Sequence, residues 1–202
     1  MGDSHYFDRR PSSKPRLGLI RTYLRGRMFE FLTASGVFSR KRIDPGTRLL
    51  IESMILPEEG TVLDIGCGYG AVGIAAAAFN PKLRVVMTDV NERAVWLARE
   101  NAKRNYVSNV EVRRGDLYEP VKDMRFHAIL SNPPISAGMR VVTPIITEAP
   151  KHLVDGGLLQ IVVRTRIGGR KLRQVMEQTF GDVEVLARGG GYRVLLSKNH
   201  QP

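Results

Sequence analysis

From residue 61 onward, short apolar runs alternate with helical segments, and this alternation constrains the fold more than any other feature. The runs are rich in Val, Ile and Leu, as buried parallel strands are. They span 61–65, 84–88, 110–113, 126–130 and 157–163. Helices are predicted between them at 70–79, 91–104, 142–153 and 169–179. Strands that alternate with helices predict an α/β fold with a doubly wound, mostly parallel sheet.

The two ends of the chain depart from this alternation. Residues 183–188 and 192–197 read as strands joined by a glycine turn without a helix, so the last strand must run antiparallel to its neighbour. Residues 5–16 read as an extended arm, and residues 17–33 as a hairpin turning at Arg25-Gly26. At 202 residues we expect one compact unit, with a basic arm and hairpin over 1–48 packed on an α/β domain over 49–202.

A glycine turn follows the first long strand. Gly66, Gly68 and Gly70 open a helix there, which is where open α/β sheets bind nucleotides. The spacing up to Ala71 also satisfies the dinucleotide fingerprint. Asp64, however, lies two residues before the first glycine, where a carboxylate would repel a pyrophosphate and suit a ligand that carries an ammonium and a sulfonium. S-adenosylmethionine (SAM) is such a ligand.

Carboxylates also end the next two strands. Asp89 is placed to accept from a ribose diol, and Asp116 from an adenine amino group. Either acid alone has a simpler explanation as a helix cap or turn residue. Three acids at successive strand ends favour a SAM site, and we expect Val90 and Leu117 to line it beside them.

The segment Asn132-Pro133-Pro134-Ile135 leaves the fourth of these strands. Two prolines remove two backbone donors and stiffen the loop. The Asn132 side-chain oxygen and the Pro133 carbonyl can then accept hydrogen bonds from an exocyclic NH₂, which keeps the nitrogen lone pair directed at a methyl donor. Taken alone, the segment is a good turn after a strand; with the glycine turn it predicts methylation of an amine.

At these motifs the sequence resembles the class I SAM-dependent methyltransferases. It is most similar to the small "MTS" type, as in the catalytic halves of guanine-N2 ribosomal RNA methyltransferases and their compact archaeal relatives. The resemblance extends from residues 5–7 through 36–39 and 43–47 to 191–194. It implies a seven-stranded sheet with the last strand antiparallel, and it places Phe38 and Thr47 near the methionine end of the cofactor.

Ile135 is a departure from the pattern of many amino methyltransferases, which carry an aromatic residue after Asn-Pro-Pro. Such a ring stacks on the target, and base stacking is worth roughly 1–3 kcal/mol. Another residue must therefore hold the ring, or the target is less flat than a base. The archaeal relatives also carry isoleucine here, so the departure does not imply loss of activity.

The net charge of +11 points to a polyanionic partner. Residues 1–48 hold 11 Lys or Arg against 4 Asp or Glu, a surplus of +7. One basic run is usually a solvated face, but a second, acid-free cluster lies next to the predicted active-site edge. We expect RNA phosphates to be contacted by both groups, namely Arg164, Arg166, Arg170, Lys171 and Arg173, with Arg25 and Arg27 of the hairpin.

The leading hypothesis is therefore an RNA methyltransferase that acts on guanine N2, most plausibly in ribosomal RNA. Adenine N6, cytosine N4 and transfer RNA remain open. Methylation of a glutamine in a translation protein would tolerate Ile135 but leaves the charge unexplained. A non-catalytic RNA-binding or ribosome-assembly module would not require Asn132 or the three acids, and Asp64 opposes a nicotinamide oxidoreductase.

Other features bound the class of protein. No apolar segment approaches the roughly 20 residues that a bilayer requires, and the N-terminus has no apolar signal core, so we expect a cytoplasmic location. Cys67 is the single cysteine and has no Cys or His partner at metal-ligand spacing. We therefore expect neither a disulfide nor a metal, and a packing role for Cys67 in the glycine turn.

Overall fold

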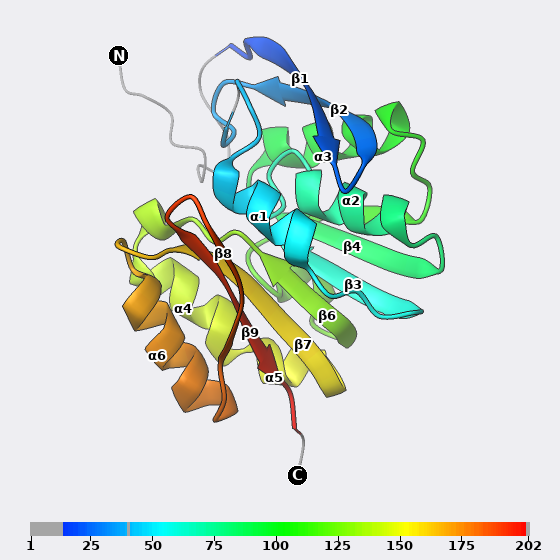
Figure 1. Ribbon diagram of the computed structural model, residues 1–202. Helices are drawn as coiled ribbons and strands as arrows, with labels where there is room; N and C mark the ends of the chain where they lie inside the picture. Colours follow the sequence, from blue (N-terminus) through cyan, green and yellow to red (C-terminus); the bar gives the residue numbers. More distant parts are fainter. Residues whose placement is uncertain (1–13, 40, 201–202) are drawn as a thin grey trace.

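A seven-stranded sheet forms the centre of the computed structural model, which describes residues 14–39 and 41–200 (Figure 1). The strand order is β5-β4-β3-β6-β7-β9-β8. The strands are β3 (Gly60–Ile65), β4 (Leu83–Asp89), β5 (Val110–Arg114), β6 (Phe126–Ser131), β7 (Leu153–Arg164), β8 (Glu184–Gly189) and β9 (Tyr192–Lys198). The first five pair in parallel, and β9 is antiparallel to both of its neighbours. The predicted sheet is thus confirmed, with β9 inserted between β7 and β8.

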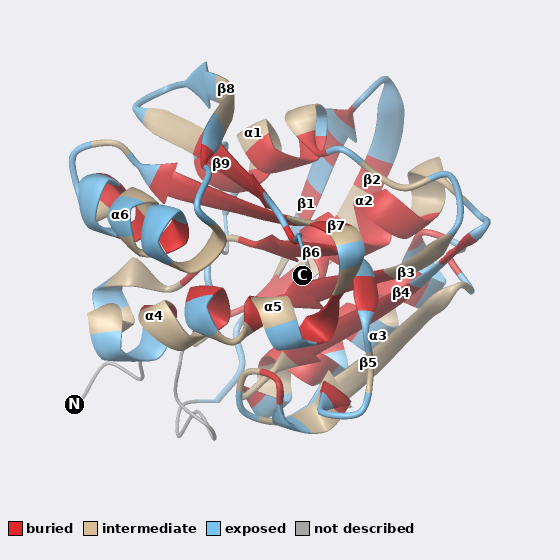
Figure 2. Cartoon of the chain, turned by 90° about the horizontal axis from the view of Figure 1, so that it is seen from below, coloured by how far each residue is buried: buried red, intermediate tan, exposed pale blue. Residues whose placement is uncertain are grey.

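Helices cover both faces of the sheet (Figure 2). They are α1 (Pro45–Ser53), α2 (Ala71–Phe79), α3 (Glu92–Arg104), α4 (Met139–Thr147), α5 (Ala149–His152) and α6 (Gly169–Phe180), with short 3₁₀ turns η1 (Glu119–Val121) and η2 (Ile135–Ala137). Neighbouring strand residues alternate between two hydrophobic clusters: Val85 and Met87 belong to the cluster that includes α1, α2 and α3, whereas Val86 belongs to the one that includes α4, α5 and α6. The sheet is therefore buried on both sides, as its apolar strands require.

The helix predicted over 142–153 is divided in the structure. Helix α4 begins earlier, at Met139, and ends at Thr147, and the short helix α5 follows. Pro150 lies in the first turn of α5, where its missing N–H is tolerated, and it disfavours continuation of the preceding helix, although α4 itself contains Pro144. Leu153 already belongs to β7, so the prediction was wrong at this end.

The expected hairpin consists of β1 (Leu17–Leu24) and β2 (Arg27–Ala34), which form a separate two-stranded sheet. Its inner side chains, including Phe29 and Phe31, are fully buried in the same core as α2 and α3. The boundary expected between residues 48 and 49 falls within α1. Residues 5–7 and the rest of the arm up to residue 13 lie outside the described residues.

Two arginines fix the hairpin turn to helix ends. The Arg25 Nη2 donates to the Met54 carbonyl at 3.0 Å, and the Arg27 Nη1 donates to the Ala78 carbonyl at 3.1 Å. Cations are favourable at helix C-termini because the last carbonyls lack partners. Helix α2 starts at the glycine turn, so Ala78 lies roughly 11 Å along the axis from it.

Within the described residues, no helix combines the length and apolarity needed to cross a membrane.

Candidate active site

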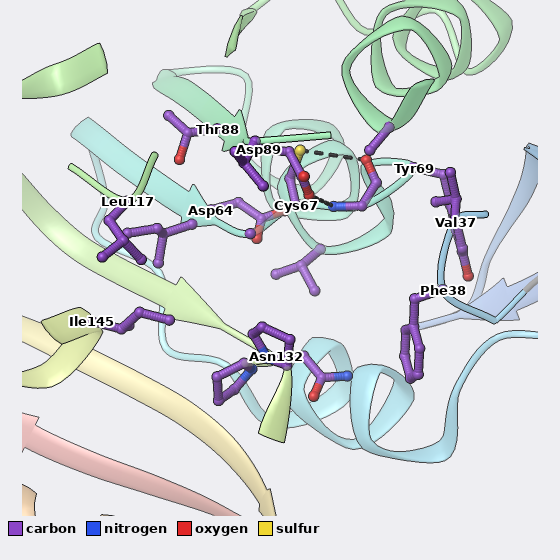
Figure 3. Close-up of a pocket in the computed structure, with 18 of the residues that line it drawn as sticks. Val37, Phe38, Asp64, Cys67, Tyr69, Thr88, Asp89, Leu117, Asn132 and Ile145 are labelled. Carbon is purple, nitrogen blue, oxygen red and sulfur yellow. Dashed lines mark hydrogen bonds between the residues drawn. The ribbon is translucent and has the colours of Figure 1, made fainter. Parts of the chain in front are cut away.

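A cavity of about 260 Å³ opens where β3, β4 and β6 end, and it brings together most of the residues predicted to form the site (Figure 3). The predicted residues that line it are Phe38, Thr47, Asp64, Gly66, Gly68, Asp89, Val90, Asp116, Leu117, Asn132, Pro133 and Pro134. Gly70 and Ile135 are not among its lining residues. The lining residues that sequence reasoning did not single out are mostly apolar, and they include Val37, Ala137, Val141 and Ile145.

The glycine turn presents bare backbone to this cavity. Gly66 and Gly68 have φ angles of 73° and 57°, which favour glycine, and a Cβ added at either would meet no atom within 4 Å. The Gly66 and Cys67 amides both donate to the Thr88 carbonyl at 2.9 Å, which holds the turn against β4. Cys67 is buried in the turn, and burial raises the pKa of its thiol. Gly70 serves as the N-cap of α2.

Two carboxylates lie beneath the turn. Asp64 Oδ2 accepts from the Gly73 amide at 2.8 Å, and burial raises the pKa of Asp64 to about 7. Asp89 accepts from the Gly68 and Asn91 amides, both at 2.8 Å, and burial raises its pKa to about 6 although these bonds lower it. Asp116 is exposed at the cavity. Buried acceptors beside open glycine backbone fit the ammonium and ribose groups of SAM better than a pyrophosphate.

The Asn132 amide has a defined orientation. Its Nδ2 donates to Asp44 Oδ2 at 3.1 Å and to Thr47 Oγ1 at 2.9 Å. An ionised carboxylate only accepts, so the NH₂ faces Asp44 and the side-chain oxygen faces the other way. Among the described residues, none donates to that oxygen. Sequence reasoning did not single out Asp44, although it stands only three residues before Thr47.

A backbone hydrogen bond forms within the proline loop. The Pro133 carbonyl, the second predicted acceptor, already accepts from the Ile135 amide at 2.9 Å and keeps one lone pair. Ile135 packs on the layer of α4 and α6, and its Cγ2 lies close to Gly168 on the segment that carries the basic cluster. The residue after Asn-Pro-Pro therefore packs on this layer and is not among the residues that line the cavity.

Phe38 is the aromatic ring that Figure 3 shows near Asn132, across the cavity. Its side chain is 38% exposed. The loop that carries it leaves β2 and is tied to the start of α3, because Asn91 Nδ2 donates to the Gly36 carbonyl at 3.0 Å and the Arg93 guanidinium donates to the Ser35 carbonyl. The loop after the hairpin thus places the partly exposed Phe38 at the cavity.

The two predicted basic groups lie in different surroundings. Arg164 ends β7, and Arg166, Arg170 and Lys171 are exposed beside it and on α6. Arg173 pairs with Glu177 at 2.9 Å. Arg25 and Arg27, by contrast, hold helix ends far from the glycine turn. No group of three or more potential metal ligands occurs within residues 14–39 and 41–200.

Comparison with known proteins agrees with this geometry. The family model described as "Methyltransferase small domain" matches residues 28–196. An uncharacterized protein of Bacillus subtilis, YbxB, is 40% identical over 96% of this chain and 98% of its own length. Ribosomal RNA small subunit methyltransferase C of Escherichia coli O9:H4 is 37% identical over 80% of this chain and 47% of its own length.

Among solved structures, the T. thermophilus 16S rRNA N2 G1207 methyltransferase, determined with AdoMet and guanosine, superposes with a TM-score of 0.81. It is 25% identical and matches 94% of this chain and 52% of its own chain. The chain therefore spans about half the length of the ribosomal RNA methyltransferases that it matches, and nearly the whole of the Bacillus protein.

Proposed function

The chain belongs to the methyltransferase small domain family and is a SAM-dependent methyltransferase, and we propose that it methylates an exocyclic amine of RNA, with guanine N2 of ribosomal RNA as the target. The observation that carries the proposal is the orientation of Asn132, whose oxygen is left as a free acceptor at the cavity. The longer relatives named as ribosomal RNA methyltransferases support this choice of substrate.

Asn132 and Pro133 would hold the acceptor nitrogen. Its two hydrogens would be donated to the Asn132 side-chain oxygen and to the remaining lone pair of the Pro133 carbonyl, so the nitrogen lone pair points into the cavity. SAM supplies an already activated methyl group when bound. The residues of this chain then have to align the amine and exclude water, and the apolar walls formed by Ala137 and Val141 serve the second task.

Phe38 is our candidate for holding the target ring. Ile135 does not line the cavity, whereas Phe38 lies across it from Asn132 and is partly exposed. A base within a duplex cannot reach an amine-holding site of this kind, so the target nucleotide would be unpaired or flipped out. Stacking on Phe38 would replace the interaction that other amino methyltransferases obtain from the residue after Asn-Pro-Pro.

The flanking RNA would follow the exposed cations of 164–173. Arg164 is connected to the site through Tyr192 and Asp44, so this cluster borders the position of the target nucleotide. The geometry supports the cluster more strongly than it supports Arg25 and Arg27, whose guanidinium groups already donate to helix carbonyls.

Transfer of a labelled methyl group from SAM tests the proposal. The acceptors would be ribosomal RNA, as naked RNA and as particles, together with total protein from cells that lack this enzyme. We expect label in RNA, recovered as N2-methylguanosine, and none with Asn132→Ala. Label confined to protein would overturn the RNA assignment in favour of glutamine methylation, and label in another nucleoside would overturn only guanine N2.

A further inference from the structure

We propose that Asp44 and Tyr192 are positioning residues that hold the Asn132 amide with its oxygen toward the methyl acceptor. Tyr192 lies 148 positions after Asp44, and nothing in the motifs connects the two. The inference rests on the proposed function only for the role of the Asn132 oxygen. The orientation itself can be measured without any substrate.

Asp44 selects between the two orientations of the amide. The oxygen and NH₂ of an asparagine have nearly the same shape, so packing alone does not distinguish them. The Thr47 hydroxyl can donate or accept, and it is compatible with both. Asp44 can only accept, so it requires the NH₂ to face it. A reversed amide would turn donors toward an amine that itself donates.

A single carboxylate oxygen performs this task and caps a helix. Asp44 Oδ2 accepts from the Thr47 amide at 2.9 Å, which caps α1, and from Asn132 Nδ2 at 3.1 Å. Asp44 is only 7% exposed, and its charge lies at the N-terminus of α1, where the helix dipole favours it. The cap holds the carboxylate in place, and so it also holds the partner of Asn132.

Tyr192 contacts the other oxygen of the Asp44 carboxylate, Oδ1. Its hydroxyl lies 3.4 Å from Asp44 Oδ1 and accepts from Arg164 Nε at 2.9 Å, with the guanidinium 5.4 Å from the centre of the tyrosine ring. Because Arg164 donates to the hydroxyl oxygen, the hydroxyl hydrogen is left for Asp44. The donors therefore run in one direction, from Arg164 through Tyr192 to Asp44.

Gly46 makes room for this tyrosine. A Cβ added there would lie 2.7 Å from both Cδ1 and Cε1 of the Tyr192 ring, which no real side chain tolerates. The ring packs directly on the first turn of α1, next to the residue that it orients. This close approach is a second, independent sign that the start of α1 and Tyr192 are built to meet.

Two substitutions of Asp44 form a matched pair. Serine is a good N-cap, but it is too short to reach Asn132, so Asp44→Ser keeps the cap and loses the orienting contact. Asparagine also caps and can place its oxygen where Oδ2 lies, so Asp44→Asn keeps the contacts with Thr47 and Asn132 but turns an NH₂ toward the Tyr192 hydroxyl, which loses its acceptor. Tyr192→Phe keeps the ring on Gly46 and removes only the hydroxyl.

The first readout is solvent exchange of the Asn132 side-chain amide protons, observed by NMR and assigned by the loss of that signal in Asn132→Ala. We expect exchange to be about tenfold faster in Asp44→Ser, where a hydrogen bond worth about 1.4 kcal/mol is lost, and only slightly faster than wild type in Asp44→Asn, which loses the Tyr192 contact alone. Tyr192→Phe should give a smaller increase in the same direction. Unchanged exchange in both Asp44→Ser and Tyr192→Phe would overturn the proposal.

The second readout is kinetic and applies to the RNA substrate. We expect Asp44→Ser to lower kcat about 10²-fold, and Tyr192→Phe and Asp44→Asn each about 3- to 10-fold, with the Kd for SAM within about twofold throughout. Equal losses in Asp44→Ser and Asp44→Asn would contradict a positioning role. If the wild-type protein does not methylate RNA, the proposed function fails while amide exchange still decides whether Asp44 orients Asn132.

Discussion

The side chain of Asn101 exchanges two hydrogen bonds with the backbone of Leu32, accepting from its amide at 2.6 Å and donating to its carbonyl at 2.8 Å. Asn105, one turn later at the C-cap of α3, does the same with Glu30 at 3.0 and 2.8 Å. Two asparagines thus pair with the edge of β2 as a neighbouring strand would. Asn101 Nδ2 also donates to the Tyr69 carbonyl at 2.8 Å, which connects the hairpin to the glycine turn.

Asn101→Ala should lower the free energy of unfolding by about 2–4 kcal/mol, because it leaves buried backbone groups of Leu32 and Tyr69 without partners. Urea unfolding measures this change. Arg21→Ala is the control, since it removes an exposed pair with Glu30 and should cost at most about 1 kcal/mol. Equal effects of the two substitutions would show that the asparagine does not anchor the hairpin.

The affinity for SAM should rise with pH. Folded pKa values of about 7 for Asp64 and about 6 for Asp89 mean that both carboxyls are largely protonated in mild acid and ionise as the pH rises. A ligand that needs both carboxylates should bind at least about tenfold more tightly near pH 7.5 than near pH 5.5. Calorimetry in two buffers should also detect proton release, and Asp64→Asn should bind more weakly and flatten the dependence.

The stability of the ligand-free protein should change with pH in the opposite sense. The pKa of Asp64 rises from 3.8 to about 7 on folding, so the folded state binds more protons between these values. Its contribution to stability is fully present below about pH 4 and is lost as the pH rises through about 7. Urea titrations at several pH values should show this loss, which Asp64→Asn should reduce. A flat profile in the wild type would contradict the raised pKa.

Phe38→Ala separates two roles for this ring. If Phe38 stacks on the target, the KM for RNA or kcat should change by about 5- to 100-fold, from roughly 1–3 kcal/mol of stacking, while the Kd for SAM changes little. If it serves the methionine end of the cofactor, as the family resemblance implied, the Kd for SAM should rise instead. Phe38→Tyr keeps a stacking ring and should retain most of the RNA affinity.

Charge removal at the two basic groups should have different consequences. Replacing both Arg166 and Lys171 with alanine should weaken RNA binding and lower the slope of log affinity against log salt by about 1 for each lost phosphate contact. Arg25→Ala should leave that slope nearly unchanged and lower stability, because Arg25 donates to the end of α1. A loss of slope with Arg25→Ala would instead place RNA on the hairpin turn.

The sequence predicted most strands and helices because they depend on local periodicity. It also placed the glycine turn and Asn132 at strand ends that meet at one cavity, while their roles remain predictions. It failed mainly where long-range packing decides. The surroundings of Ile135 depend on neighbours distant in sequence, such as Gly168. The helix end near Pro150 was wrong for a local reason, because a proline three residues before the predicted end disfavours the helix there. Asp44 belongs to the segment 43–47 that carries the family resemblance, but its partner Tyr192 is distant in sequence and nothing local connects the two residues.

The insertion of β9 between β7 and β8 affects the order in which the protein can be completed during synthesis. Tyr192 begins the last strand, so it leaves the ribosome after the glycine turn, all three acids and Asn132. A nascent chain can assemble the cofactor half of the sheet, from β5 to β6, before that strand exists. The Asn132 amide acquires the support that Tyr192 gives through Asp44 only when the final strand enters the sheet, so a cofactor site can form before the proposed acceptor site is complete.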